Sequence, residues 1–250
     1  ERRPAAQSAA TVLCSEQAAQ LFRRRAPEFA GGVSALSTGV DATYFDPAAG
    51  FADPYDGRGA RVMVFTGAMD YWPNAHAVEW FVAEVFPKVQ AVIPDAAFCI
   101  VGRDPGRAVR QLANCPGVTV TGTVPDVRPY LAHAAVAVAP LQIARGVQNK
   151  VLEAMAMARP VVASPQALEG LSVKVPDEAL SAADAPQFSA QLVACLTRDM
   201  TALGASARRA VLRAYHWVSC LAGPAALPPS SPGARAPPRR PSLCPSPRRA

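Results

Sequence analysis

The sequence has few residues that could hold a metal ion or a disulfide framework. Its three histidines, His76, His133 and His216, are far apart, and its six cysteines form no C-x-x-C pair. Scattered cysteines of this kind predict neither a zinc site nor a set of disulfides, and reduced thiols in the cytoplasm are the default. We therefore expect no metal, no cofactor and a cytoplasmic location.

Long hydrophobic runs are absent as well. A membrane-spanning helix needs about 20 consecutive apolar residues, and the most apolar stretch, around Val136–Pro140, is much shorter. The charged start, Glu1–Arg3, is followed by no apolar core of the kind that secretion signals contain. The sequence thus predicts neither a membrane span nor export.

Acidic residues are lacking in the C-terminal segment, residues 217–250, which carries five arginines. The net charge is +6, and removing these five from the 25 basic residues leaves 20 basic against 19 acidic side chains in residues 1–216. No aromatic residue follows Trp217, so the basic segment offers no ring on which bases could stack. We expect no nucleic-acid partner.

The same segment has a composition that cannot bury a hydrophobic core. Proline makes up 9 of its 34 residues, and arginine, alanine and serine fill much of the rest, so the sequence predicts disorder. Because proline, arginine, alanine and glycine all have GC-rich codons, one hypothesis is a shifted reading frame. The alternative is a genuine Pro-rich interaction tail.

Apolar runs alternate with helical patterns through the rest of the chain. The predicted strands are 11–15, 33–36, 61–66, 96–101, 118–121, 134–139, 161–162 and 171–175, and the predicted helices are 16–25, 74–92, 105–113, 126–131, 147–158, 184–197 and 199–215. Such alternation is typical of α/β proteins with parallel strands and crossover helices. The expected fold class is α/β, with a Rossmann-like doubly wound parallel sheet.

Glycines and polar residues follow the predicted strands. Gly67 follows the strand 61–66, and Asn74 is predicted to cap the next helix. Gly102 and Arg103 follow the strand 96–101, and Val124 lies beyond the strand 118–121. In doubly wound sheets ligands bind beyond the carboxyl ends of the strands. We expect a nucleotide there, although for Arg103 an ordinary surface arginine is the alternative.

The segment Arg145–Gly170 contains the remaining candidates. Gly146 precedes a predicted helix whose first turn can hold an anion, since its backbone N–H groups and dipole face the ligand. Lys150 and Glu153 lie three residues apart on one face of that helix. A cation suits phosphates and a carboxylate suits sugar hydroxyls. The alternative is a solvated ion pair.

The stretch GVQNKVLEAMAMARPVVASPQALEG resembles the signature segment of the retaining family-4 glycosyltransferases of GT-B fold, and more narrowly the sugar transferases found with bacterial exopolysaccharide genes. The resemblance implies that Glu153 reaches the ribose hydroxyls of a nucleoside-diphosphate sugar, and Lys150 matches a lysine of the branch without the usual glutamate pair. Arg145 stands eight residues before Glu153, where the family's first glutamate is expected. The catalytic candidates are Glu153, Lys150 and Arg145, and the donor-binding candidates are Gly67, Asn74, Gly102, Arg103, Val124, Gly146 and Glu153.

Other segments resemble the same family. STGVDATYFDP, residues 37–47, is similar to its hinge between two Rossmann-like domains, and GTVPDVRPYL, residues 122–131, is similar to its base-recognition loop. The resemblance implies that residues 1–47 are a remnant of an N-terminal acceptor domain with the hinge, that 48–216 form the donor-binding domain, and that 217–250 are a tail. We expect the rest of the acceptor domain to be missing.

The implied function is transfer of a sugar from a nucleoside-diphosphate sugar to a glycan or lipid-linked acceptor in exopolysaccharide biosynthesis. Peripheral association with the inner face of the plasma membrane, through the missing domain, is part of the same expectation. The alternative is a nucleotide-binding fragment without catalysis. An epimerase of the same architecture is a third reading, against which Arg145 counts because such an enzyme would use carboxylates at the anomeric carbon.

Overall fold

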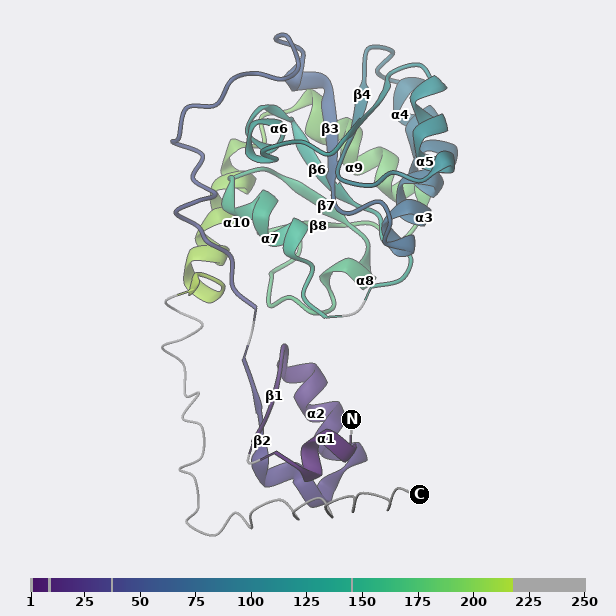
Figure 1. Ribbon diagram of the computed structural model, residues 1–250. Helices are drawn as coiled ribbons and strands as arrows, with labels where there is room; N and C mark the ends of the chain where they lie inside the picture. The colour runs from purple at the N-terminus through teal and green to yellow at the C-terminus, as the bar shows by residue number, and fades with distance from the viewer. Residues whose placement is uncertain (1, 9, 37, 145, 218–250) are drawn as a thin grey trace, which may run out of the picture.

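The computed structural model describes residues 2–8, 10–36, 38–144 and 146–217, whose strands form two separate sheets (Figure 1). The larger sheet is built from β3 (Val62–Thr66), β4 (Ala97–Val101), β5 (Val118–Gly122), β6 (Val136–Ala139), β7 (Val161–Ala163) and β8 (Leu180–Ser181). All its strand pairs are parallel, in the order β5-β4-β3-β6-β7-β8. Counted along the chain, this is the 3-2-1-4-5-6 order of Rossmann folds. The predicted α/β class and parallel sheet are confirmed, with β3 at the centre.

Helices cover both faces of this sheet. They are α3 (Trp72–Trp80), α4 (Phe86–Gln90), α5 (Arg107–Gln111), α6 (Arg128–His133), α7 (Asn149–Ala156), α8 (Pro165–Leu168), α9 (Ala185–Thr197) and α10 (Thr201–Ala214). A π-helical turn, Phe81–Val85, joins α3 to α4, and 3-10 turns stand at Gly59–Arg61 and Leu112–Asn114. Helix α9 contacts α4, whereas α7 contacts α10, and these two pairs lie on opposite faces of β6 and β7 (Figure 1).

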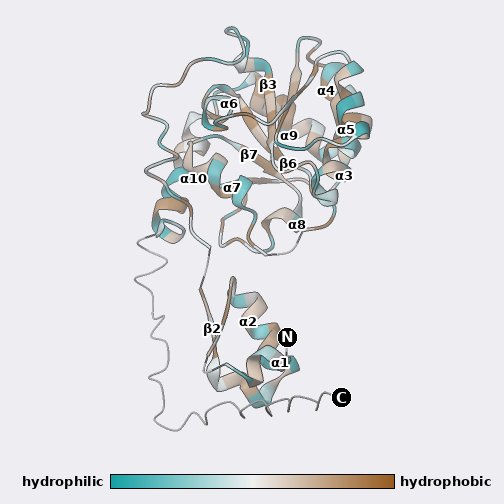
Figure 2. Ribbon diagram, viewed as in Figure 1, coloured by the Kyte–Doolittle hydropathy of each residue, from teal (hydrophilic) through white to brown (hydrophobic). Residues whose placement is uncertain are grey.

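The strands form because their apolar residues run without interruption, which allows both faces of the sheet to be buried. Every residue of β3, β6 and β7 is buried, and Figure 2 shows hydrophobic colouring along these strands. The ring of Phe98 on β4 packs against Phe81, with 4.4 Å between ring centroids, and against Phe86. Aromatic rings bury large areas, so these contacts hold the π-helical turn and α4 on the sheet.

The smaller sheet pairs β1 (Thr11–Leu13) with β2 (Val33–Ala35) in parallel and carries α2 (Glu16–Arg25), with α1 (Arg2–Ala6) and a 3-10 turn, Pro27–Gly32, beside it. Its core is a separate hydrophobic cluster that includes Ala19, Phe22 and Val33. Ser15 caps α2, because its hydroxyl accepts a hydrogen bond from the Ala18 N–H at 3.2 Å. The predicted strand, helix and strand in residues 11–36 are confirmed.

The segment between the two sheets is fastened to the larger one from residue 40 onward. Val40 forms a parallel bridge with His216. The guanidinium of Arg128 lies 3.7 Å from the centre of the Tyr44 ring, and Arg208 forms an ion pair with Asp46 at 3.1 Å. Buried apolar side chains of this segment, Val40, Phe45 and Tyr55, belong to the larger core. The two hydrophobic clusters are thus joined through the short stretch that precedes Val40.

The predicted strand at 171–175 is wrong, and the strand is β8, further along the chain. The Ser172 N–H donates to the Tyr215 hydroxyl, and the Lys174 N–H donates to the carboxylate of Glu178 at 2.8 Å. Because side chains satisfy these backbone groups, the segment needs no neighbouring strand. The apolar pattern of residues 171–175 carried no information about these two acceptors, of which Tyr215 is 43 residues away from its donor.

Two helix starts also differ from the predictions. Asn74 does not cap a helix, because α3 begins at Trp72 with Pro73 in its first turn, where the fixed φ angle of proline suits a helix. The helix predicted at 147–158 is shorter, because Gly146 before it and Ala158 after it have positive φ angles of 68° and 53°. The predicted cap of α9 is confirmed, since Asp184 accepts from the Gln187 N–H at 2.9 Å.

The packing of α10 on α7 gives a test of the fold. Gly204 on α10 faces the end of α7, where an added Cβ atom would lie 2.1 Å from the carbonyl oxygen of Ala158. Helix propensity alone would favour alanine by about 1 kcal/mol, but overpacking against backbone atoms costs about 1–3 kcal/mol. We expect Gly204→Ala to lower the free energy of unfolding by about 1 kcal/mol in urea titrations. Gly50→Ala, whose Cβ would meet nothing within 4 Å, is the control, and equal stability of both variants would contradict the contact.

Candidate functional site

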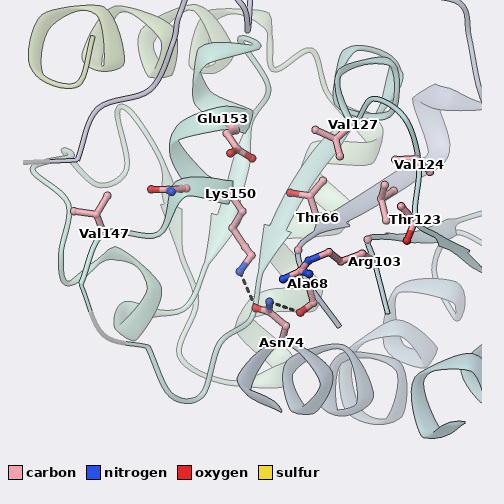
Figure 3. Close-up of a pocket in the computed structure, with 14 residues that line it drawn as sticks. Thr66, Ala68, Asn74, Arg103, Thr123, Val124, Val127, Val147, Lys150 and Glu153 are labelled. Atoms are coloured by element: carbon pink, nitrogen blue, oxygen red, sulfur yellow. Dashed lines mark hydrogen bonds between the residues drawn. The ribbon is translucent and has the colours of Figure 1, made fainter. Parts of the chain in front are cut away.

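A cavity of about 480 Å³ lies at the carboxyl edge of the larger sheet (Figure 3). It is lined by residues that follow β3, β4 and β5 and by the first turns of α7. Seven of the predicted site residues line it, namely Gly67, Asn74, Gly102, Arg103, Val124, Lys150 and Glu153. The structure therefore brings together side chains that are far apart in the sequence, as expected for the switch point of a Rossmann-like sheet.

The floor of the cavity is made of two glycine backbones in contact. A Cβ atom added at Gly102 would lie 1.6 Å from the Gly67 carbonyl oxygen, so no other residue fits there without moving the strand ends apart. The Gly67 N–H donates to the Val101 carbonyl at 3.0 Å, which fixes the same contact from the other side. A Cβ atom at Gly67 would also meet the side chains of Asn74 and Lys150. Close packing of backbone atoms thus requires a glycine at 102, and a side chain at 67 would displace those of Asn74 and Lys150.

Lys150 extends from α7 across this floor to the start of α3. Its ammonium group donates a hydrogen bond to the side-chain oxygen of Asn74 at 2.7 Å, and it lies 5.1 Å from the centre of the Phe65 ring (Figure 3). The Asn74 amide in turn donates to the Ala68 carbonyl at 2.8 Å, which orients its oxygen toward the lysine. The ammonium is therefore held in place by a neutral partner and keeps its charge for an anionic ligand.

Burial shifts the ionisation of both charged groups of α7 in the pocket. It lowers the pKa of Lys150 from 10.5 to about 8, an effect that the neighbouring Glu153 partly opposes. Burial likewise raises the pKa of Glu153, with Lys150 acting in the opposite direction. The ion pairs between described residues include none between Lys150 and Glu153, so the predicted alternative of a solvated pair is wrong. The lysine bonds to Asn74 instead.

The start of α7 borders the same cavity. Its N-cap residue, Gln148, forms no side-chain capping hydrogen bond to the helix, and Asn149 lines the cavity. Backbone N–H groups of a first helical turn that no side chain caps are suited to an anion. Together with Lys150, this turn makes the positive part of the pocket.

The opposite rim is apolar with one exposed cation. Val124 and Val127 lie on the far side of the cavity from Val147 (Figure 3). Arg103 stands at the edge, where it is 62% exposed and pairs with Asp70 at 4.0 Å and with Asp104 at 3.5 Å. Its charge is thus partly neutralised by exposed carboxylates, whereas the ion pairs between described residues include none with Lys150.

Two predicted site residues are not part of this cavity. Gly146 lines a neighbouring cavity, and Arg145 lies outside the described residues. Seven further residues line the cavity and were not predicted as site residues, namely Thr66, Ala68, Val101, Thr123, Val127, Val147 and Asn149. Each lies within a few residues of a strand end or of the start of α7, and that position was the available signal.

The chain belongs to a known family of transferases. The sequence profile of the family described as glycosyl transferases, group 1, matches residues 60–198, which is more than half of the chain and includes all six strands of the larger sheet. The resemblance to glycosyltransferases stated above is therefore confirmed at this level. No curated protein sequence matches the chain.

Solved structures with this fold extend the comparison. They include a glycosyltransferase from Rickettsia africae ESF-5, with a TM-score of 0.66 and 13% identity, covering 86% of this chain and 62% of that one. Alr3699/HepE of Anabaena in complex with UDP has a TM-score of 0.65 and 15% identity, covering 85% and 61%. Sucrose-phosphate synthase from Thermosynechococcus elongatus has 0.64 and 22%, covering 84% and 55%. Such identities show a shared fold, and the chain spans about three-fifths of the length of these proteins.

The described residues contain neither a membrane-spanning helix nor a cluster of metal ligands. In the part of the chain that the structure describes, every helix is too short or too polar to span a bilayer. In the same part, no three His, Cys, Asp or Glu side chains gather into a group that could hold a metal ion. The expectation that no metal or cofactor takes part stays a prediction.

The lowered pKa of Lys150 gives a test that needs no ligand. Between pH 8 and 10.5 the unfolded chain binds more protons at this residue than the folded chain does, so folding stability contributed by Lys150 rises with pH in that window. The stability of Lys150→Met relative to wild type should therefore fall by about 1–3 kcal/mol across it. Urea unfolding at pH 7, 9 and 10.5 measures the difference. The control is Lys88→Met, which removes an exposed lysine of α4, and an equal fall in that variant would contradict the burial of Lys150.

Proposed function

We propose that this chain binds the donor in a reaction that transfers a sugar from a nucleoside-diphosphate sugar to a glycan or lipid-linked acceptor. One observation carries the proposal. In a member of a glycosyl transferase family, the uncapped start of α7, the Lys150 ammonium and the carboxylate of Glu153 converge on one cavity beyond the strand ends. A diphosphate needs the first two groups, and a ribose needs the third.

The positive part of the pocket would act on the leaving group. When the bond between the anomeric carbon and the diphosphate oxygen breaks, that oxygen gains negative charge. A charged Lys150 and the dipole of α7 are positioned to stabilise this charge without reorganising, because Asn74 already holds the ammonium in place. The acceptor hydroxyl would attack the anomeric carbon and release its proton.

The rest of the nucleotide would lie toward β5. Glu153 is one turn along α7 from Lys150, and its carboxylate bonds to no other described group, so both of its oxygens are available to ribose hydroxyls. Val124 and Val127 form the apolar rim against which a base can lie. Alr3699/HepE binds UDP, as its crystal structure records, which makes uridine diphosphate the first nucleotide to try.

Finer parts of the proposal rest on the sequence resemblance. They are retention at the anomeric carbon, a role in exopolysaccharide biosynthesis, an acceptor domain to which residues 1–47 belong, and peripheral membrane association through that domain. From Val40 onward the segment between the two sheets packs with the larger sheet, whereas β1 and β2 pack with their own hydrophobic cluster. This difference supports the assignment of residues 37–47 as a hinge segment. A catalytic role for Arg145 also stays a prediction.

The role of Glu153 can be tested by titration calorimetry. Glu153→Gln keeps the shape of the side chain but exchanges an acceptor oxygen for a donor, so affinity for the tightest binder among UDP, GDP and ADP should fall about 10- to 150-fold. Thermal stability should not fall, because burial already disfavours the charged carboxylate. Glu84→Gln, which changes an exposed glutamate outside the cavity, should bind as wild type does.

The 2′,3′-dideoxy analogue completes this experiment. It should weaken binding to wild type much more than binding to Glu153→Gln, since the variant has already lost the contact. Equal losses in both proteins would show that Glu153 does not hold the ribose. If none of the three diphosphates binds wild type, the proposed function itself fails.

A further inference from the structure

A second cavity, of about 920 Å³, adjoins the nucleotide pocket at the start of α7. Gly146 lines the second cavity and the next residue, Val147, lines the first, and Gly170 of the second cavity packs against the backbone of both. On the side of the larger sheet the lining of the second cavity includes three polar side chains, Gln142, Gln166 and Glu169, together with the apolar Ile143 and Ala144. Helix α2 of the smaller unit forms the other wall. The site described above uses none of these groups.

The loops that carry these polar side chains are tied to each other. The buried hydroxyl of Ser164 donates to the Leu141 carbonyl at 2.6 Å and accepts from the Ala167 N–H at 3.2 Å, which joins the loop after β6 to the start of α8. Gly170 packs so closely that an added Cβ atom would lie 2.5 Å from the Gly146 carbonyl oxygen. The backbone that presents Gln142 and Glu169 is therefore fixed before any ligand arrives, as a selective binding site requires.

The order of groups along the two cavities matches the order of groups in a sugar nucleotide. Figure 3 shows Val124 and Val127 on one side, Lys150 in the middle and Val147 on the other side. A ligand with its base against the valines and its diphosphate at Lys150 extends past Val147 into the second cavity. The group attached to the distal phosphate is the sugar, so the sugar reaches the space beside Gly146.

We propose that Glu169 binds hydroxyl groups of the donor sugar and so determines which sugar is accepted. This inference rests on the proposed function, because it takes the first cavity as the nucleotide pocket. Among the described residues that line the second cavity, Glu169 is the one carboxylate. A carboxylate accepts strong hydrogen bonds from hydroxyl groups, and the amides of Gln142 and Gln166 can both donate and accept. Glu169 is thus a specificity residue, distinct from the groups that hold the nucleotide.

The test compares a nucleotide with its sugar conjugate. UDP, UDP-glucose and UDP-N-acetylglucosamine are titrated into the 250-residue chain and into Glu169→Gln by calorimetry, with GDP and GDP-mannose as a second set. The variant should bind the free diphosphate within about twofold of wild type. It should bind the preferred sugar conjugate about 10-fold more weakly, because one charge-assisted contact to the sugar is lost. Glu169→Asp keeps the charge on a shorter side chain. Its affinity for the sugar conjugate should lie between those of wild type and Glu169→Gln.

The outcomes separate the two proposals. If none of UDP, GDP and ADP binds wild type, the proposed function fails and this inference falls with it. If a diphosphate binds wild type but Glu169→Gln weakens the diphosphate and its sugar conjugate equally, or weakens neither, Glu169 does not contact the sugar and the inference is overturned. Glu84→Gln serves as the control glutamate and should leave both affinities unchanged.

Discussion

The pocket depends on the contact between the backbones of Gly67 and Gly102. Because no side chain separates them, the ends of β3 and β4 close into a continuous floor, and Asn74 can reach over it from α3. Asn74 then fixes the ammonium of Lys150, which comes from α7 on the other half of the sheet. A single steric constraint thus aligns groups from two halves of a Rossmann-like sheet, where the fold places its ligands.

The arrangement combines function with a cost in stability. Burial lowers the pKa of Lys150 to about 8, so the charged form of this lysine is less stable in the folded chain than in water. An anion bound beside it would offset this cost. Glu153 is affected in the same sense, because burial raises its pKa. Both groups would become more favourable as ions if a ligand supplied a charge or a hydroxyl partner, and perturbed pKa values of this kind cluster at functional sites.

Much of the larger sheet could be predicted because its information is local. Uninterrupted apolar runs such as Val62–Thr66 define buried strands, and the glycines after them mark the ligand edge. What could not be predicted depends on contacts between distant residues. In the segment before β8, the Ser172 N–H bonds to Tyr215, 43 residues away, and the role of Asn74 depends on a lysine 76 residues away. The local sequence pattern carries no information about either contact. It therefore predicted a strand at residues 171–175 and a helix cap at Asn74.

Arg208 bears on where this domain can be cut. Its guanidinium donates to the Ala156 carbonyl at the end of α7 and to the Phe45 carbonyl at 2.9 Å, and it pairs with Asp46. The family match covers residues 60–198, and a fragment starting at residue 60 would remove two of these three acceptors, Phe45 and Asp46, and uncover the core beneath Phe45 and Tyr55. A fragment intended for crystallisation or nuclear magnetic resonance should instead start before Val40 and extend through His216, so that the bridge between these two residues is retained.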